Sequence, residues 1–529
     1  MEESQISFFP DLIEYQAETL GDQTYIIFDQ EHISFAEYNR AACSFANGLL
    51  DHGAKPGDGI AILMGNCPEF LYTFYGVPRA GLYSVPINVA LFGDGLRFIL
   101  ENSDVTYLVI DDTLYSKISD LGKPVETIRQ IFVRRTTDAP LPDNTLDIKE
   151  LLAASSEKPN HTIKEGDMSQ LLYTSGTTGL PKGVVGRQQP GVALWWKMGA
   201  AMMFQPDDVL YTCLPLFHAN ALMLTAGFAM AGGRPFGLDT RFTASGFWDR
   251  IRYYKATTFN GLGAMIPILM KQPEKESDPD NLVRIVNSAA CPANLWEAFE
   301  QRFDVKIWEG YGAVDGGGLA ITNHGDAPVG SVGKPAPEVE WRLVDDSEND
   351  VPQGEYGELI TKNKNQPAST VEYYKNPEAS NKKVRGGWIR TGDLFFADKE
   401  GFLYFVDRKT DSMRRRGENI SSWEVENLVE KYDDVAECAA FGVPSELAED
   451  EVMIWVRPKT GLTLDLEELM QHCADVMPHF MVPRYVDIVE GIPRTKTLRV
   501  QKTAMKKQGV TGRTWDREAE MPDLELKRK

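Results

Sequence analysis

The sequence predicts an α/β protein with a large N-terminal domain and a small α+β C-terminal domain. Helical and strand-like patterns alternate as far as about residue 340, and short period-two segments follow. Because strands separated by helices build mostly parallel sheets, we expect two parallel-sheet subdomains and a small β-rich subdomain in the large domain. We assign residues 1–408 to the large domain, 409–510 to a C-terminal lid domain and 511–529 to a charged tail.

The alternation is clearest in the first 150 residues. Residues 34–50 have helical spacing, and Ser34 followed by Glu37 forms a capping-box pattern at their start. GDGIAILMGN (57–66) is typical of a buried strand ending in a turn, and PEFLYTFYGVPRAG (68–81) of a helix. The next strands are predicted in LYSVPIN and VTYLVIDD. This order indicates βαβ units.

The pattern changes after Pro335. VEWRLVDD, GELITKN and GFLYFVDR are short period-two segments between turns, which predicts the β-rich subdomain. After DRKTD (407–411) comes a βαβ-like unit of about 100 residues with helical patterns in SSWEVENLVEKY and LDLEELMQHCADVM. From Thr511 the chain is charged and poorly patterned, so we expect a frayed end.

Composition restricts the function classes. The net charge of −22 argues against nonspecific binding to nucleic acid or to an anionic membrane. Six scattered cysteines without a CxxC pair suit a reducing compartment and no structural zinc. The start MEESQISFFP lacks the features of a secretory signal, and the uncharged run 209–233 is too interrupted to span a membrane. We expect a cytoplasmic protein with no nucleic-acid or membrane partner, and a homodimer by default.

The segment YTSGTTGLPKG (173–183) carries the most specific signal. Glycine, serine and threonine make a poor helix or strand, but backbone N–H groups, hydroxyls and one ammonium can surround a tetrahedral anion. It is not a P-loop of the GxxxxGK[ST] type, because Gly183 follows Lys182. The segment resembles the phosphate loop of the adenylate-forming superfamily, which contains acyl-CoA synthetases, adenylation domains of peptide synthetases and firefly-type luciferases.

Further motifs follow in the order that this resemblance implies. EGYGAVD would place Tyr311 on adenine, TGD would place Asp393 on the ribose hydroxyls, and Arg408 would contact ribose or phosphate. RRRGENISSWEVE resembles the motif that presents a glycine, here Gly417 followed by Glu418, beside a pantetheine tunnel. The likeness covers about residues 10–507, and the wording is closest to the crotonobetaine/carnitine-CoA ligase-like branch.

The resemblance also implies a set of site residues. Lys182, Asp315, His218 and Arg499 would take catalytic roles, with Asp315 and Thr174 as magnesium ligands. The remaining nucleotide-binding and cofactor-binding positions would be Thr174, Ser175, Gly176, Thr177, Thr178, Gly179, Ala289, Ala290, Glu309, Gly310, Gly312 and Val314. His218 could gate the substrate carboxylate, or it could be a satisfied core histidine.

Several positions depart from the family pattern. Val314 stands where the family has a threonine, and a lost bond to a charged group is worth about 1.5–3 kcal/mol. Asp315 replaces a glutamate, and Arg499 replaces the catalytic lysine of the C-terminal domain, a change that is not conservative. Lys496 or Lys502 could substitute with a shift of register. At the hinge, Thr410 stands where a charged residue is common.

The function implied is AMP-forming ligation of a small carboxylic acid to coenzyme A, with ATP and Mg²⁺ as cofactors. The acid would be short or medium aliphatic, or carnitine-like. The C-terminal domain would swing between the two half-reactions, as it does in the family. Two alternatives stay open: adenylation with a non-CoA acceptor, and nucleotide binding without turnover.

Other candidates have weaker signals. The arginines 414–416 and the later run PRTKTLRVQKTAMKK predict a basic C-terminal face that would suit the phosphates of CoA. RNA is a less favoured ligand for that face, because no aromatic residues are interleaved. Trp195 and Trp196 could line a substrate pocket, although aromatic residues on a helix are more often core. No histidine lies near Cys291 in the sequence, which argues against a nucleophilic role.

Overall fold

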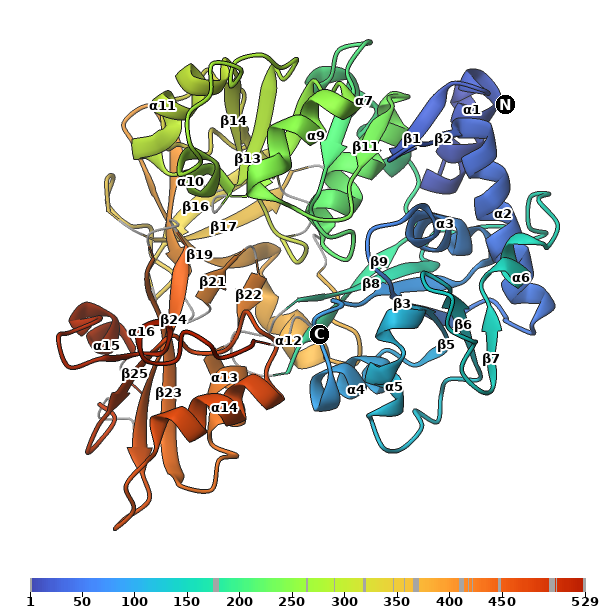
Figure 1. The fold of residues 1–529 in the computed structure, drawn as a ribbon. Helices are drawn as coiled ribbons and strands as arrows, with labels where there is room; N and C mark the ends of the chain where they lie inside the picture. The colour runs from blue at the N-terminus through green and yellow to red at the C-terminus, as the bar shows by residue number, and fades with distance from the viewer. Residues whose placement is uncertain are drawn as a thin grey trace.

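Two parallel sheets lie side by side in the large domain, and two smaller sheets continue the chain toward its C-terminus, as a computed structural model shows (Figure 1). The structure describes the chain except residues 1, 175–179, 263–264, 290, 317–319, 346, 356, 365–370, 409–412, 417, 421, 446–448, 494–499, 501 and 527–529, and except the side chains of residues 294, 320, 406–408, 419, 423, 503 and 504. This architecture confirms the predicted fold class.

The first sheet is built from residues 59–187 and has the strand order β7-β6-β5-β3-β4-β8-β9. Its strands are β3 (Gly59–Leu63), β4 (Tyr83–Pro86), β5 (Val105–Asp111), β6 (Gln130–Arg134), β7 (Thr145–Asp147), β8 (Met168–Thr174) and β9 (Lys182–Arg187). Five helices accompany them: α2 (Phe35–Asp51), α3 (Pro68–Gly76), α4 (Gly93–Asn102), α5 (Ser116–Ser119) and α6 (Lys149–Leu152).

Both faces of this sheet are covered. Ile60 and Ile62 of β3 belong to the core cluster that contains α2 and α3, whereas Ala61 and Leu63 belong to the cluster that contains α4. Because successive side chains of a strand point to opposite faces, β3 is apolar throughout. The capping box of α2 is present, with Glu37 N donating to Ser34 Oγ (3.2 Å) and Ser34 N to the Glu37 carboxylate (2.9 Å).

The second sheet takes the two strands at one of its ends from the N-terminus. Its order is β15-β14-β13-β12-β10-β11-β1-β2, and β1 pairs in parallel with β11 so that Ile26 lies opposite Phe236. Its strands are β1 (Thr24–Phe28), β2 (Glu31–Ser34), β10 (Leu210–Thr212), β11 (Phe236–Leu238), β12 (Thr258–Leu262), β13 (Ile285–Ala289), β14 (Lys306–Gly312) and β15 (Ala320–Asn323). Its helices are α1 (Phe9–Leu20), α7 (Val192–Met203), η4 (Asn220–Gly227), α8 (Phe228–Gly232), α9 (Phe247–Tyr254), α10 (Met265–Met270) and α11 (Ala293–Phe303).

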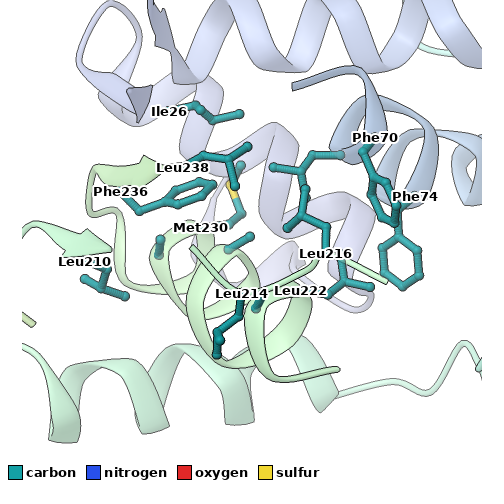
Figure 2. Close-up of a cluster of buried hydrophobic side chains, with 14 of the residues drawn as sticks. Ile26, Phe70, Phe74, Leu210, Leu214, Leu216, Leu222, Met230, Phe236 and Leu238 are labelled. Carbon is teal, nitrogen blue, oxygen red and sulfur yellow. The ribbon is translucent and has the colours of Figure 1, made fainter. Parts of the chain in front are cut away.

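One apolar core joins the two subdomains (Figure 2). Phe70 and Phe74 of α3 lie near Leu216 and Leu222, which follow β10 of the second sheet. All four side chains are buried. Since burial of one such side chain contributes about 1.5–3 kcal/mol, this shared core holds the two sheets in a fixed relation.

An antiparallel sheet, a two-stranded hairpin and a mixed four-stranded sheet complete the chain. The β-rich subdomain consists of β16 (Val339–Val344), β17 (Gly357–Asn363), β18 (Val384–Arg385), β19 (Trp388–Ala397) and β20 (Leu403–Arg408), with α12 (Pro377–Lys383) before β18. The C-terminal domain contains the hairpin β21 (Met413–Arg415) and β22 (Glu418–Ile420), the sheet β23 (Val435–Pro444), β24 (Asp450–Pro458), β25 (Tyr485–Ile488) and β26 (Trp515–Asp516), and α13 (Ser422–Val429), α14 (Leu466–Val476), α15 (Lys502–Gln508) and α16 (Arg517–Glu520).

The chain does not fray from Thr511, so this expectation was wrong for residues 511–526. Trp515 and Asp516 form β26 at the edge of the C-terminal sheet, and Leu524 packs against the domain core. Trp515 and the leucines that follow are spaced too irregularly to show a period, which is why the sequence pattern did not reveal the strand. The predicted boundary at residue 408 stays a prediction.

Arg415 of β21 is one of the most deeply buried charged side chains, 1% exposed. Its Nη1 donates to the carbonyl oxygens of Phe480 (3.2 Å) and Val482 (3.0 Å), and its Nη2 lies 2.7 Å from Glu451 Oε2. Burial lowers the pKa of Arg415, and the charge of Glu451 opposes this shift. The ion pair ties the hairpin to the C-terminal sheet.

Arg415→Met is expected to destabilise the protein by about 3–5 kcal/mol, because it leaves Glu451 buried without its counter-charge. The double variant Arg415→Met/Glu451→Leu is expected to recover most of that loss, since neither charge then remains buried. Denaturant unfolding followed by circular dichroism measures both. A double variant no more stable than the single one would contradict this account of the pair.

Candidate active site

The turn between β8 and β9 leads to the first group of polar side chains. Thr174 ends β8 and Lys182 begins β9, and they pair across the ladder with Thr174 Oγ1 3.4 Å from the Lys182 carbonyl oxygen. The ammonium of Lys182 lies 5.2 Å from the centre of the Tyr373 ring, within cation–π range. Five predicted loop residues lie outside the described part of the chain: Ser175, Gly176, Thr177, Thr178 and Gly179.

Asp315 is the centre of a cluster drawn from three segments. The Tyr373 hydroxyl donates to Asp315 Oδ2, and Lys383 Nζ lies 3.2 Å from the same oxygen. Lys383 also donates to the carbonyl oxygen of Thr391 (3.3 Å). Burial lowers the pKa of Lys182, and the negative charge of Asp315 opposes this shift. Two lysines and one carboxylate therefore share a half-buried region.

The donor set of this cluster suits a polyphosphate with a hard divalent cation. Mg²⁺ is usually bound through one or two carboxylates together with substrate phosphates, and Asp315 supplies such a carboxylate. The hydroxyl of Thr174, the other predicted ligand, makes a long hydrogen bond to the backbone carbonyl oxygen of Lys182. Rotation of the side chain would turn this hydroxyl toward a ligand. Among the described residues, no group of three or more His, Cys, Asp or Glu side chains forms a metal cage of its own.

Sequence reasoning missed Tyr373 and Lys383. Tyr373 lies in VEYYKN, which has no motif spacing. Lys383 ends α12, where a lysine is expected simply because cations stabilise helix C-termini. Only the fold shows that both residues lie at Asp315.

Lys182→Arg is expected to keep its adenylation activity to higher pH than the wild-type protein. The ammonium of Lys182 must be charged to attract phosphate, and its lowered pKa means that the charge is lost earlier as pH rises. A guanidinium stays charged throughout this range. Pyrophosphate exchange measured across the alkaline range tests this expectation. If the rate falls over the same alkaline pH range in both proteins, the fall is caused by the titration of a group other than Lys182.

Tyr311 and Asp393 form the second group. The Tyr311 hydroxyl donates to Asp393 Oδ2 (2.6 Å), and the ring lies edge-on to Phe395 with centroids 4.8 Å apart. Asp393 is 6% exposed and pairs in the β19–β20 ladder with Arg408, whose side chain lies outside the described part. An aromatic ring held beside a buried carboxylate suits a base and a sugar hydroxyl.

The other predicted nucleotide positions lie at the carboxyl ends of β13 and β14, where open α/β sheets bind ligands. Glu309 is buried and accepts a hydrogen bond from the Cys291 N–H (2.9 Å). Burial, and then Glu309, raise the pKa of the Cys291 thiol, which argues against a nucleophilic thiolate. The strands place the remaining positions as follows: Ala289 ends β13, Gly310 and Gly312 lie in β14, Val314 follows it, and Ala290 is outside the described residues.

His218 contacts the C-terminal domain. Its Nε2 lies 3.0 Å from Glu418 Oε2, and Asn88 Nδ2 donates to the same oxygen (3.1 Å). His218 is thus a partly exposed residue at a domain contact rather than a core histidine. Gly417, next to Glu418, lies outside the described residues.

The basic residue predicted to act from the C-terminal domain lies outside the described part of the chain. Arg499, together with Lys496, falls in the undescribed segment 494–499. Its described flanks, Ile492 and Val500, pack with Phe441 and Trp455, on the other face of the sheet from Ala440 and Ile454, which share a core with the hairpin. Arg499 therefore stays a prediction.

Two other cations proposed from the sequence are already engaged. The ammonium of Lys502 lies 2.7 Å from Ser422 Oγ and 2.6 Å from Glu426 Oε1, which argues against its replacing the catalytic lysine. Arg415 is buried, so the predicted basic face is wrong in including it. Trp195 is 52% exposed, whereas Trp196 stacks on Phe228 in the core. Among the described helices, none is both long and apolar enough to cross a membrane.

Comparison with known proteins adds the family context. The profile "AMP-binding enzyme" matches residues 13–369, and "AMP-binding enzyme C-terminal domain" matches residues 424–498. A crotonobetaine/carnitine–CoA ligase from Salmonella heidelberg (strain SL476) is 30% identical over 509 residues, 92% of this chain and 96% of the relative. A second relative with that description, from Salmonella typhi, is 29% identical over 506 residues, again 92% of this chain and 96% of the relative.

Solved structures of similar fold include ligases with different acceptors. The o-succinylbenzoate CoA synthetase of Bacillus subtilis has a TM-score of 0.78 and 23% identity, covering 94% of this chain and 99% of that one. The amide bond synthetase McbA from Marinactinospora thermotolerans also has a TM-score of 0.78 and 23% identity, covering 95% and 99%.

Proposed function

Because the chain belongs to the AMP-binding enzyme family, we propose that it is an AMP-forming ligase that joins a small carboxylic acid to coenzyme A. The observation that carries this proposal is the position of Lys383. Its ammonium lies 3.2 Å from Asp315 Oδ2 and 3.3 Å from the carbonyl oxygen of Thr391, two residues before Asp393. One cation thereby joins the polyphosphate cluster to the Tyr311–Asp393 group, as a single nucleoside triphosphate requires.

In the first step the carboxylate of the acid attacks the α-phosphate of ATP and pyrophosphate leaves. Both reactants are anions, so the barrier falls where positive charge already surrounds the phosphates. Lys182 and the loop 174–179 hold the β- and γ-phosphates, Tyr311 packs on the adenine, and Asp393 binds the ribose hydroxyls. Arg499 supplies charge during adenylation. Mg²⁺ on Asp315 and Thr174 would neutralise charge that develops on the phosphates.

In the second step the thiol of CoA attacks the acyl carbonyl carbon, a C–S bond forms and AMP leaves with the electron pair of the broken C–O bond. The hairpin β21–β22 lies beside His218 in this structure, with Glu418 in contact. That contact supports a role for His218 at the acyl group and for Gly417, the neighbour of Glu418, beside the pantetheine of CoA. Arg408 contacts ribose or phosphate. Reaching the first-step arrangement is proposed to require a rotation of the C-terminal domain, because the described flanks of Arg499 pack on the sheet face opposite to the hairpin.

The acid is proposed to be short or medium aliphatic, or carnitine-like. The crotonobetaine/carnitine–CoA ligases to which the chain is similar support this class. Two residues after His218, Asn220 Oδ1 accepts a hydrogen bond from Asn260 Nδ2 (2.9 Å). A homodimer in the cytoplasm completes the proposal.

A mass-spectrometric screen tests the function. The protein is incubated with Mg-ATP, CoA and a panel of aliphatic, aromatic and betaine acids, and AMP and acyl-CoA are both measured. A CoA thioester from one acid supports the ligase. AMP that forms only when an amine or another acceptor is added would favour the second candidate, adenylation with a different acceptor, to which the similarity to an amide bond synthetase points. ATP binding without AMP from any acid would contradict both.

A further inference from the structure

Residues 87–95, which run from the end of β4 into the first turn of α4, form a part of the large domain that meets the hairpin β21–β22 and the region of α13. Asn88 donates to Glu418 Oε2 (3.1 Å), and Asp94 pairs with Lys431 just after α13 (3.1 Å). Between them, Ala90 is 9% exposed and belongs to the core cluster of the C-terminal domain, which contains Met413 and Ile420 of the hairpin. We call residues 87–95 the docking segment.

A buried lysine holds the docking segment from within the large domain. Lys117 of α5 is 5% exposed, and its ammonium donates to the carbonyl oxygens of Val89 and Leu91 (3.3 Å to Leu91). The segment is further shaped by Asn88, whose Oδ1 accepts from the Ala90 N–H (2.8 Å). Lys117 thus fixes the two residues on either side of Ala90, the residue that enters the other domain.

We propose that Lys117 is a positioning residue for the thioester-forming step, because it fixes the docking segment that seats the hairpin β21–β22 against His218. The proposal rests on the two-step function given above. Lys117 touches neither reactant. It acts through Val89 and Leu91 on Ala90 and Asn88, and through Asn88 on the Glu418 carboxylate that His218 also contacts.

The effect should be selective for one half-reaction. The docking segment contacts the hairpin face of the C-terminal domain, whereas the flanks of Arg499 pack on the opposite face of its sheet. The described groups assigned to adenylation lie elsewhere, on β9 (Lys182), β14 (Tyr311), α12 (Lys383) and β19 (Asp393), with Asp315 just after β14. A misplacement of about 1 Å can cost about a hundredfold in rate, so a loosened segment would slow thioester formation and leave adenylation intact.

The first test separates the half-reactions. Lys117→Met keeps most of the buried chain and removes the donors. Lys123→Met, an exposed lysine of the same region, is the matched control.

With crotonobetaine, or the acid that yields most AMP in the screen, we expect pyrophosphate exchange within about twofold of the wild type for both variants. We expect single-turnover thioester formation to fall at least about tenfold in Lys117→Met only. Asn88→Asp, which faces Glu418 with a like charge, should act in the same way. Equal losses in both steps, or an unchanged thioester step, would overturn the proposal.

The second test does not depend on turnover. Asp94→Cys and Lys431→Cys place an exposed thiol on each domain, and the six native cysteines are buried. A short bismaleimide should link this pair, and adding Lys117→Met should slow the linking several-fold. Linking at an unchanged rate would show that Lys117 does not hold the docked arrangement. If the wild-type protein made no AMP with any acid but this linking still depended on Lys117, the proposed function would fail while the docking role stood.

Discussion

Asp393→Ala is expected to lower kcat/KM for ATP by about 10²–10⁴-fold. Its carboxylate accepts the Tyr311 hydroxyl and is proposed to accept the ribose hydroxyls, and each bond to a charged group contributes about 1.5–3 kcal/mol. The change also removes the hydrogen bond that holds the Tyr311 hydroxyl, and the ring of Tyr311 is proposed to pack on adenine. Steady-state formation of AMP as a function of ATP concentration measures the loss.

The matched control is Asp326→Ala, in the exposed turn after β15. It should leave kcat/KM for ATP within about twofold of the wild type, since it removes an aspartate far from any proposed contact. A wild-type value for Asp393→Ala in a folded protein would contradict the placement of ribose at β19. Asp393→Asn, which keeps the shape but not the charge, separates loss of charge from loss of packing.

Asp315→Asn is expected to lower kcat by about 10²–10³-fold and to raise the Mg²⁺ concentration needed for half-maximal rate. The substitution removes the carboxylate that lies 3.2 Å from Lys383 and is proposed to hold magnesium. It also takes away the negative charge that opposes the lowering of the Lys182 pKa, so the alkaline limb should move to lower pH.

Pyrophosphate exchange measured at fixed ATP and increasing Mg²⁺ gives both the maximal rate and the Mg²⁺ concentration needed for half-maximal rate. Asp315→Glu keeps a carboxylate at this position and should retain most of the wild-type rate. A loss that more magnesium does not reduce at all, or an unchanged magnesium requirement, would assign Asp315 a role in positioning Lys383 instead. An alkaline limb that stays where it is would also contradict the coupling between Asp315 and Lys182.

The local signals in the sequence predicted the fold because they agree with one another. The capping box at Ser34 marks a helix, and the apolar run at Ile60 marks a strand covered on both faces, so the alternation of elements could be followed residue by residue. No comparable signal in the sequence predicted which sheet the N-terminal strands β1 and β2 would join. Nothing near Ile26 indicates that its partner lies at Phe236, because strand pairing over that separation depends on the whole topology.

The site residues also divide into those that the sequence predicted and those that only the structure identifies. Lys182 lies in a loop whose composition indicates anion binding, whereas Tyr311, Asp315 and Asp393 lie in short motifs that resemble those of the adenylate-forming superfamily. The structure gathers Asp315 with Lys182 and Tyr311 with Asp393. Tyr373 and Lys383 reach Asp315 from a segment with no motif, so only the packed chain identifies them. The same holds for Lys117, because its proposed role depends on hydrogen bonds to the carbonyl oxygens of Val89 and Leu91. Backbone acceptors leave no trace in an amino-acid sequence.

The return of the N-terminal hairpin to the second sheet has a consequence for synthesis. Strands β3 to β9 form a sheet from one uninterrupted stretch, so the first subdomain can close as soon as residue 187 has left the ribosome. Strand β1 pairs with β2 on one side, but its other side has no partner until β11 at residues 236–238 emerges. For about 200 residues of elongation, the chain therefore carries an apolar strand with one unpaired side, of the kind that pairs with other chains. Chaperone demand during translation should be greatest in that interval.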